Sequence, residues 1–378
     1  MMDINERFEL ITRNAEEVLT KEDLKNFLET NEKLKHYIGF EISGKIHLGT
    51  GLMSGSKIAD FQKAKVACSC YLATWHAWIN NKLGGDFDTI KRVGDNYFKE
   101  GLKVSIDIMG GDSEKVKFIT GDELYHNNDD YWRTVIEVSK NITLSRAMKS
   151  ITILGRKEGE SVNFAQLVYP AMQVADIFTQ GLNIAHAGMD QRKAHVIARE
   201  VAHKLNIQPL INKAGQKYSP VAIHHHLILG LQKPAVWPVP TENLQELWSS
   251  QKMSKSVPGS AVFILDSEEE IKSKLSKAFC PEKNVLFNPV LDWAKHLLFV
   301  KDKFELNIER PEKFGGNITY YSYFDLEKDF EAGKVHPLDL KKAVGEALVK
   351  KLAPARKHFA TPKLQKVVEE VNNLVITR

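Results

Sequence analysis

The first 120 residues alternate between two hydrophobic patterns. Residues 1–35 place apolar side chains at helical spacing between charged ones, as in ERFELITRNAEEVL and KEDLKNFLE, which predicts amphipathic helices. HYIGFEI (36–42) then predicts a strand, residues 51–65 a helix, VACSCYLATW (66–75) a second strand, and VKFIT (116–120) a third after further helix-like sequence. This order predicts an α/β fold with a doubly wound parallel sheet, whose ligands lie at the carboxyl ends of the strands.

The pattern of apolar and charged residues changes twice in the second half of the chain. Residues 134–202 are mostly helical in pattern, and LNIAHAGMDQRKAHVIAREVAHKL (182–205) reads as a strand, a glycine turn and a helix. The proline-rich GLQKPAVWPVPTE (230–242) predicts a loop on the surface. After residue 264 the pattern predicts amphipathic helices with many lysines. We place a domain boundary near residues 262–285. The predicted domains are residues 1–265, with a helical insertion at about 125–165, and an all-α domain at 266–378.

Composition narrows the class of protein. A chain of 378 residues with 43% hydrophobic and 26% charged residues fits a soluble globular protein of two domains. We find no apolar run of membrane-spanning length, and the charged start MMDINERFEL lacks the apolar core of a signal peptide, so we expect a cytoplasmic protein. The three cysteines favour reduced thiols, and the net charge of +4 allows a polyanionic partner without requiring one.

A candidate anion site follows the first strand, where His47-Leu48-Gly49-Thr50 heads a segment of small residues. A helix N-terminus offers unpaired N–H groups, Gly49 leaves room for a ligand, and His47 adds a donor for a phosphate oxygen. Alone, this motif is better explained as a strand–turn–helix with a solvated histidine. Two hundred residues later, however, Lys252 and Lys255 lie on a serine-rich loop, and mobile lysines suit the charge that grows on a polyphosphate as a P–O bond breaks.

A second candidate site lies on one face of a predicted helix. Tyr169, Gln173 and Asp176 occupy positions i, i+4 and i+7 within the apolar segment LVYPAMQVADIF. Buried polar groups need partners, so this face either binds a ligand or belongs to an internal hydrogen-bond network.

Together, HLGT, VYPAMQVADI, HAGMDQRKAH, KMSKS, AFCPEK, RPEKFGG and HPLDLK resemble the class I aminoacyl-tRNA synthetases, and most closely the tyrosyl enzymes of the archaeal and eukaryotic type. The resemblance runs from about residue 36 to 345. It implies a Rossmann-like catalytic domain and a C-terminal helical anticodon-binding domain. It further implies a homodimer that forms tyrosyl-adenylate from tyrosine and ATP, with Mg²⁺ accompanying the ATP, and then charges tRNA(Tyr).

The resemblance also implies roles for individual residues. His47, Lys252 and Lys255 would be catalytic. The tyrosine substrate would be bound by Tyr37, Tyr169, Gln173, Asp176 and Gln191. ATP would be bound by His47, Gly49, Thr50, Lys252, Ser254, Lys255 and Ser256. The tRNA would be contacted by Arg192, Lys193, Phe314, His336 and Asp339. Taken without the resemblance, Phe314 reads as a core residue and His336 as a helix cap.

Three features depart from the family pattern or invite another interpretation. Thr50 replaces the usual second histidine of the first motif, although its hydroxyl can still reach a phosphate or a backbone carbonyl. Thr74, in YLATWHAW, replaces a usual aspartate and puts in doubt a contact near the substrate's amino group, whereas His76 is retained. The run from His224 to His226 alternates faces if extended, so we expect no zinc site from it and no protein-bound metal.

Three alternatives share some of these features. A tryptophanyl relative has the same fold and both nucleotide motifs, but Asp176 with Tyr37 favours a phenol, which can donate and accept, over an indole, which only donates. A non-catalytic RNA-binding paralogue would explain Thr50 and Thr74, but both motif lysines remain. An adenylating enzyme with another acceptor is disfavoured by the RPEKFGG and HPLDLK motifs.

Overall fold

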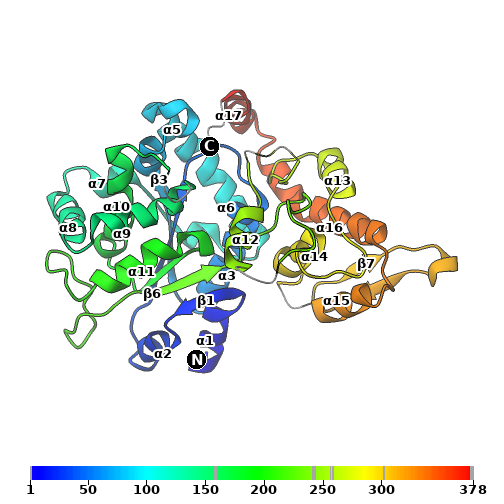
Figure 1. Cartoon of the computed structure of the whole chain (residues 1–378), viewed down its shortest axis with the longest axis horizontal. Coiled ribbons are helices and arrows are strands. Elements are labelled where there is room, and N and C mark those ends of the chain that lie inside the picture. The colour runs from blue at the N-terminus through cyan, green and yellow to red at the C-terminus, as the bar shows by residue number, and fades with distance from the viewer. Residues whose placement is uncertain are drawn as a thin grey trace.

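A six-stranded sheet with the order β1-β6-β5-β2-β3-β4 forms the centre of the computed structural model. The structure describes residues 2–156, 160–240, 244–255, 257, 259–300 and 303–374. The strands are β1 (Ala15–Leu19), β2 (Lys35–Glu41), β3 (Ala67–Ala73), β4 (Lys117–Thr120), β5 (Ile184–Gly188) and β6 (Val221–His225). All neighbouring pairs are parallel except β1 and β6. The predicted doubly wound α/β sheet is confirmed (Figure 1).

The strand order creates a crevice at one place. The chain winds from β2 outward to β3 and β4, and later returns to the other side of β2 through β5 and β6. Loops that leave the carboxyl ends of β2 and β5 therefore run in opposite directions, which opens a space for a ligand between them. Every residue of β5 and of β6 is buried, as expected for inner parallel strands covered on both faces.

The N-terminal segment differs from its helical prediction. Residues 4–12 form α1 (Ile4–Thr12) and residues 21–29 form α2 (Lys21–Glu29), but residues 15–19 form an edge strand that pairs with β6. The positive φ of Asn14 turns the chain out of α1. The pairing with β6 outweighs a weak helical periodicity, because the backbone groups of β6 need partners on that side.

Among the remaining helices of the first 251 residues, those within 54–63, 87–108 and 129–201 follow the predicted pattern, whereas those at 74–79, 121–125 and 244–251 were not predicted. In chain order these helices are α3 (Ser54–Lys63), α4 (Thr74–Ile79), α5 (Phe87–Val93), α6 (Lys99–Ile108), α7 (Gly121–Tyr125), α8 (Asp129–Lys140), α9 (Leu144–Ser150), α10 (Phe164–Thr179), α11 (Arg192–Val201) and α12 (Leu244–Gln251). The predicted strand at 66–75 ends at Ala73, because Thr74 begins α4.

The C-terminal region is mainly helical, as predicted. It contains α13 (Glu268–Ser276), α14 (Pro289–Trp293), α15 (Tyr323–Glu331), α16 (Pro337–His358) and α17 (Pro362–Asn373). A short antiparallel pair, β7 (Leu306–Ile308) and β8 (Ile318–Tyr320), was not predicted, and the loop between its strands projects from the molecule (Figure 1).

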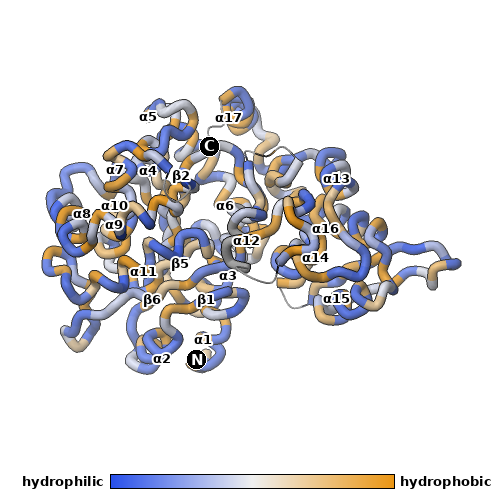
Figure 2. The backbone as a smooth tube through the Cα atoms, viewed as in Figure 1, coloured by the Kyte–Doolittle hydropathy of each residue, from blue (hydrophilic) through white to orange (hydrophobic). Residues whose placement is uncertain are grey.

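The apolar interior runs through both regions. Buried residues of α3 and α6 belong to the same cluster as Trp293, Leu348 and Leu352 of the C-terminal helices. Figure 2 shows apolar stretches along β6 and in α14. Among the described residues, no helix combines the length and apolar character needed to cross a membrane.

Candidate active site

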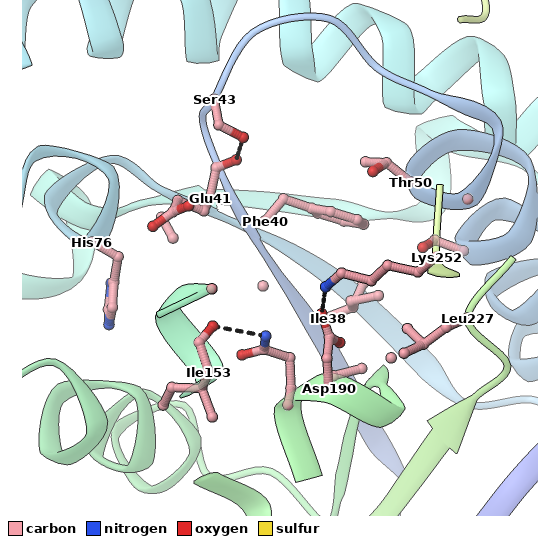
Figure 3. A pocket seen from close by; sticks show the side chains of 18 of the residues that line it. Ile38, Phe40, Glu41, Ser43, Thr50, His76, Ile153, Asp190, Leu227 and Lys252 are labelled. Atoms are coloured by element: carbon pink, nitrogen blue, oxygen red, sulfur yellow. Dashed lines mark hydrogen bonds and ion pairs between the residues drawn. The ribbon is translucent and has the colours of Figure 1, made fainter. Parts of the chain in front are cut away.

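A pocket of about 370 Å³ lies at the carboxyl ends of β2, β5 and β6. The strand order predicts a ligand site at this place. Residues from β2, from the loop after it, from α10 and from residues 252–255 line this one pocket. Figure 3 shows Lys252, Asp190, Thr50 and Glu41 around it, with His76 at one side. The two groups of candidate residues found in the sequence therefore face a common space.

The first motif forms a tight turn that fixes the ring of His47. The backbone N–H of Thr50 donates to His47 Nδ1 at 3.3 Å, so Nε2 carries the proton of the neutral ring, and Thr50 Oγ1 lies 3.2 Å from that atom. Burial and the nearby Lys255 and Lys252 lower the pKa of His47 to about 3. A Cβ at position 49 would lie 3.1 Å from the His47 ring, which explains Gly49. His47 is thus a neutral N–H donor at the pocket.

The lysine loop brings two cations to the pocket near His47. Lys252 Nζ lies 2.5 Å from Asp190 Oδ2, and this carboxylate raises the pKa of the lysine. Lys255 Nζ donates to Ser43 Oγ. Burial lowers the pKa of Lys255 to about 8, although Glu41 opposes the shift. Ser254 also lines the pocket, whereas Ser256 lies outside the described residues.

The predicted polar face of α10 is present and lines the inner end of the pocket. Asparagine and glutamine at the helix start form a capping box that sets its first turn. Tyr169, Gln173 and Asp176 all reach the pocket, as does Tyr37 from β2. Gln173 Nε2 donates to Gln191 Oε1 at 3.2 Å, and Gln191 Nε2 donates to the carbonyl of Ile153 at 3.0 Å.

The slot is the inner end of the pocket, and its residues are Tyr37, Tyr169, Gln173 and Asp176. Asp176 is its acidic group. It is only 1% exposed, and burial raises its pKa to about 8, while a hydrogen bond from Tyr125 opposes the shift. The Tyr125 hydroxyl donates to Asp176 Oδ1 at 2.8 Å and accepts a hydrogen bond from Tyr71. His76 Nε2 lies 3.8 Å from Asp176 Oδ2, and burial lowers the pKa of His76 to about 3. A neutral imidazole thus faces the second carboxylate oxygen.

Sequence reasoning missed Tyr71 and Asp190, which line the pocket, and Tyr125, which contacts Asp176 from behind it. Tyr71 and Tyr125 come from a strand and a short helix, where aromatic residues ordinarily fill the core. Asp190 precedes Gln191 in the quoted GMDQRK motif, so that motif held the signal for it. Thr74, which departs from the family pattern, is buried at the start of α4, and its Oγ1 has no hydrogen-bond partner among the described residues.

The candidate nucleic-acid contacts lie outside the pocket. Arg192 begins α11 and forms an ion pair with Glu17 at 2.8 Å, and Lys193 Nζ donates to the carbonyl of Lys149. Phe314 is 62% exposed in the β7–β8 loop, so the interpretation of this residue as core is wrong.

His336 and Asp339 belong to the start of α16. His336 is the helix cap that the sequence favoured, with Nδ1 accepting from the N–H of Leu338 at 3.2 Å. Asp339 lies in the first turn. Arg310, at the base of the β7–β8 loop, donates to the carbonyl of Lys334 and so ties this loop to the segment before His336.

The three consecutive histidines diverge, as their alternation predicted. His224 forms hydrogen bonds with His195 and Glu17, and His225 with His186. His226 forms them with Glu16 and Asp292. These three side chains are therefore not ligands of one common ion.

Comparisons with known proteins agree with this geometry. The family model described as tRNA synthetases class I (W and Y) matches residues 29–353. A tyrosine–tRNA ligase of Thermococcus sibiricus is 58% identical over the full length of both chains, and one of Pyrococcus abyssi is 59% identical over 95% of this chain and 96% of its own. The crystal structure of the Pyrococcus horikoshii tyrosyl-tRNA synthetase complexed with L-tyrosine has a TM-score of 0.94 at 55% identity, covering 98% of this chain and all of that one.

Proposed function

The chain belongs to the class I tRNA synthetases of the tryptophan and tyrosine type, and on that premise we propose that it is a tyrosine–tRNA ligase. It activates tyrosine with ATP to tyrosyl-adenylate and pyrophosphate, and then transfers the tyrosyl group to the 3′-terminal ribose of tRNA(Tyr). Tyrosine–tRNA ligases at 55–59% identity, matched over 95–100% of this chain, support this reaction.

One observation carries the proposal most directly. The neutral donor His47 and the two loop lysines line the same pocket as Tyr37, Gln173 and Asp176. A nucleoside triphosphate and an amino acid can therefore meet in that pocket, with the phosphates between His47 and the lysine loop and the side chain in the slot against α10.

The chemistry needs no general base, because the tyrosine carboxylate is already a nucleophile at neutral pH. It attacks the α-phosphorus, and the bond from the α-phosphorus to the bridging oxygen of pyrophosphate breaks. We assign His47 Nε2 to a phosphate oxygen, Lys252 and Lys255 to the departing pyrophosphate, and Gly49 and Thr50 to the nucleotide. Positioning and charge stabilisation supply the acceleration. Mg²⁺ enters as the counter-ion of ATP.

The slot suits a phenol better than an indole. Asp176 accepts from the substrate hydroxyl, and Tyr37 can donate to the same oxygen, whereas an indole offers only one N–H donor. Gln173 and Gln191, which are hydrogen-bonded to each other, are assigned with Tyr169 to the α-amino group. Phenylalanine lacks the hydroxyl and would leave Asp176 and Tyr37 buried without that partner. This cost favours tyrosine over phenylalanine.

The other assignments follow from surface features. Exposed Phe314 is suited to stack on an unpaired anticodon base, and His336 and Asp339 at the start of α16 to contact base edges. Arg192 and Lys193 would lie beside the acceptor stem. We keep the division into a catalytic domain at 1–265 and an anticodon-binding domain at 266–378, and a cytoplasmic location, as parts of the proposal.

A homodimer is part of the same proposal. Large apolar side chains are exposed on α8, at the start of α9 and at the start of α10, namely Trp132, Ile136, Leu144 and Phe164. Large apolar side chains exposed on helices that pack together are typical of a protein–protein interface. We assign it to a second copy of this chain, because the family resemblance implies a dimer.

ATP–pyrophosphate exchange with each of the twenty amino acids tests the proposed reaction. We expect exchange with tyrosine alone, followed by charging of tRNA(Tyr). Exchange driven by tryptophan, or no exchange with any amino acid in a folded sample, would contradict the proposal.

A further inference from the structure

Four ionisable side chains from three distant parts of the sequence meet outside the pocket. Glu16 comes from β1 and His226 directly follows β6, while Asp292 and His296 come from α14 and the turn of π-helix after it (294–298). His226 Nδ1 lies 2.8 Å from Glu16 Oε1, and His226 Nε2 lies 2.7 Å from Asp292 Oδ1. The rings of His226 and His296 are stacked at 4.1 Å. All but Glu16 are buried.

The spacing suits a metal ion. One possible ligand atom from each of Glu16, His226 and His296 lies within 4.8 Å of the other two. Zinc takes nitrogen and carboxylate ligands at about 2.0–2.2 Å, which places two tetrahedral ligand atoms about 3.4 Å apart. Side-chain rotations that move these atoms by about 1 Å, and that tilt the two stacked rings so that their nitrogens face one ion, would produce the coordination distances.

A second, independent observation points to a missing partner. His296 Nδ1 is buried and has no hydrogen-bond partner among the described residues. An unpaired polar atom in the interior is costly unless a ligand meets it.

Asp292 provides the support that metal-binding histidines require. Its Oδ2 accepts from the backbone N–H of Leu229 at 2.9 Å, which fixes the carboxylate, and its Oδ1 faces His226 Nε2. A carboxylate behind an imidazole orients the ring. A metal ion bound at Nδ1 would replace the proton that this nitrogen shares with Glu16 Oε1, and that proton would leave to solvent. The two carboxylates, Glu16 and Asp292, would balance the charge of a divalent ion.

We propose that Glu16, His226 and His296 bind a divalent transition-metal ion of the Zn²⁺ class, with Asp292 positioning His226. A groove of about 1380 Å³ lined by all four residues gives the ion a path from solvent. This proposal departs from the sequence-based expectation of no protein-bound metal, because Glu16 and His296 lie far from His226 in the sequence and only the fold brings them together. Only His226 of the three consecutive histidines takes part. The ion would join the N-terminal edge strand, the central sheet and the C-terminal helices, so it stabilises the folded chain.

The test uses the full chain after EDTA treatment and without ATP. Co²⁺ is added while visible absorption is recorded, and Zn²⁺ binding is measured by calorimetry. We expect one Co²⁺ per chain, displaced by Zn²⁺, and a rise in melting temperature with Zn²⁺, because a ligand that binds only the folded state stabilises it. Glu16→Gln and His296→Gln should each weaken Zn²⁺ binding at least about 100-fold, since even residues behind the ligands are worth about 10–100-fold.

His358→Gln is the matched control. His358 Nε2 lies 2.9 Å from Glu100 Oε2, so this variant also removes a histidine paired with a glutamate, but on another part of the surface. It should bind Zn²⁺ like the unchanged chain. Glu16 is half-exposed on an edge strand, so its variant keeps the core intact. The absence of Co²⁺ absorption, or equal Zn²⁺ affinity in both ligand variants and the control, would overturn the proposal. The four side chains would then serve only as an ion-paired cluster that joins these parts of the fold.

Discussion

Replacement of Asp176 by alanine is the sharpest test of the proposed substrate slot. Asp176 is 1% exposed, and the Tyr125 hydroxyl donates to its Oδ1 at 2.8 Å. In the proposal, the second carboxylate oxygen accepts from the phenol of the substrate. Asp176→Ala removes that acceptor and opens a small cavity next to Tyr125, without touching the phosphate end of the pocket.

The magnitude follows from the cost of one buried, charged hydrogen bond. Such a bond contributes about 1.5–3 kcal/mol, so kcat/KM for tyrosine should fall about 10- to 150-fold. Phenylalanine should gain, because in the unchanged protein it leaves the carboxylate unpaired, at a cost of about 1–3 kcal/mol. Together these effects lower the preference for tyrosine over phenylalanine by about two to four orders of magnitude.

ATP–pyrophosphate exchange with both amino acids at pH 8.5 provides the measurement. Burial raises the pKa of Asp176 to about 8, so the carboxyl group is mainly ionised at that pH. Lys255 acts on ATP with either amino acid, so the ratio of kcat/KM for tyrosine to kcat/KM for phenylalanine cancels any effect of pH on Lys255. Asp176→Asn keeps the volume and one acceptor oxygen and should give an intermediate ratio. A tyrosine preference that is unchanged in a folded Asp176→Ala protein would refute the assignment.

Four further predictions concern other parts of the molecule. Lys255→Ala should slow adenylate formation about 100- to 1000-fold in rapid-quench experiments while changing the Kd of tyrosine little, and an equal loss in both would contradict its role. Because burial lowers the pKa of Lys255 to about 8, rising pH removes its positive charge, so kcat/KM for ATP should decline above pH 8; a flat profile up to pH 10 would argue against this. Phe314→Ala should weaken tRNA binding about 5- to 150-fold, the value of one stacked base, with pyrophosphate exchange unaffected, and normal charging at low tRNA would exclude the contact. Gly55→Ala should lower the free energy of unfolding, measured in urea, by about 1–3 kcal/mol, because its methyl group would lie 2.8 Å from the carbonyl oxygen of Ser105. As the control, Gly345→Ala would place its methyl group 3.6 Å from Leu275 and should be neutral or stabilising by up to about 1 kcal/mol.

Local periodicity was enough to predict some of the site. Tyr169, Gln173 and Asp176 lie within eight residues, and once a helix forms, its pitch places them on one face. The turn from His47 to Thr50 is likewise short, and its glycine is explained by a contact two residues away. Structure within one turn depends mainly on the covalent geometry of the chain, so the sequence alone determined these features.

Other parts depended on contacts that local pattern does not contain. Residues 15–19 read as helix but pair with β6, about two hundred residues later. An apolar side chain is ordinarily buried, yet Phe314 is exposed in the β7–β8 loop. The fold alone brought Tyr125 to Asp176, Asp190 to Lys252, and Glu16 and His296 to His226.

The sequence by itself thus determined the alternation of strands and helices, the polar face of α10 and the two motifs that carry the family resemblance. The tertiary structure decided which of these faces share a pocket, what each ionisable group meets, and therefore which pKa values shift. The physical reason is that short-range periodicity reflects bond geometry, whereas burial and pairing depend on packing summed over the whole core, which no local stretch of sequence contains.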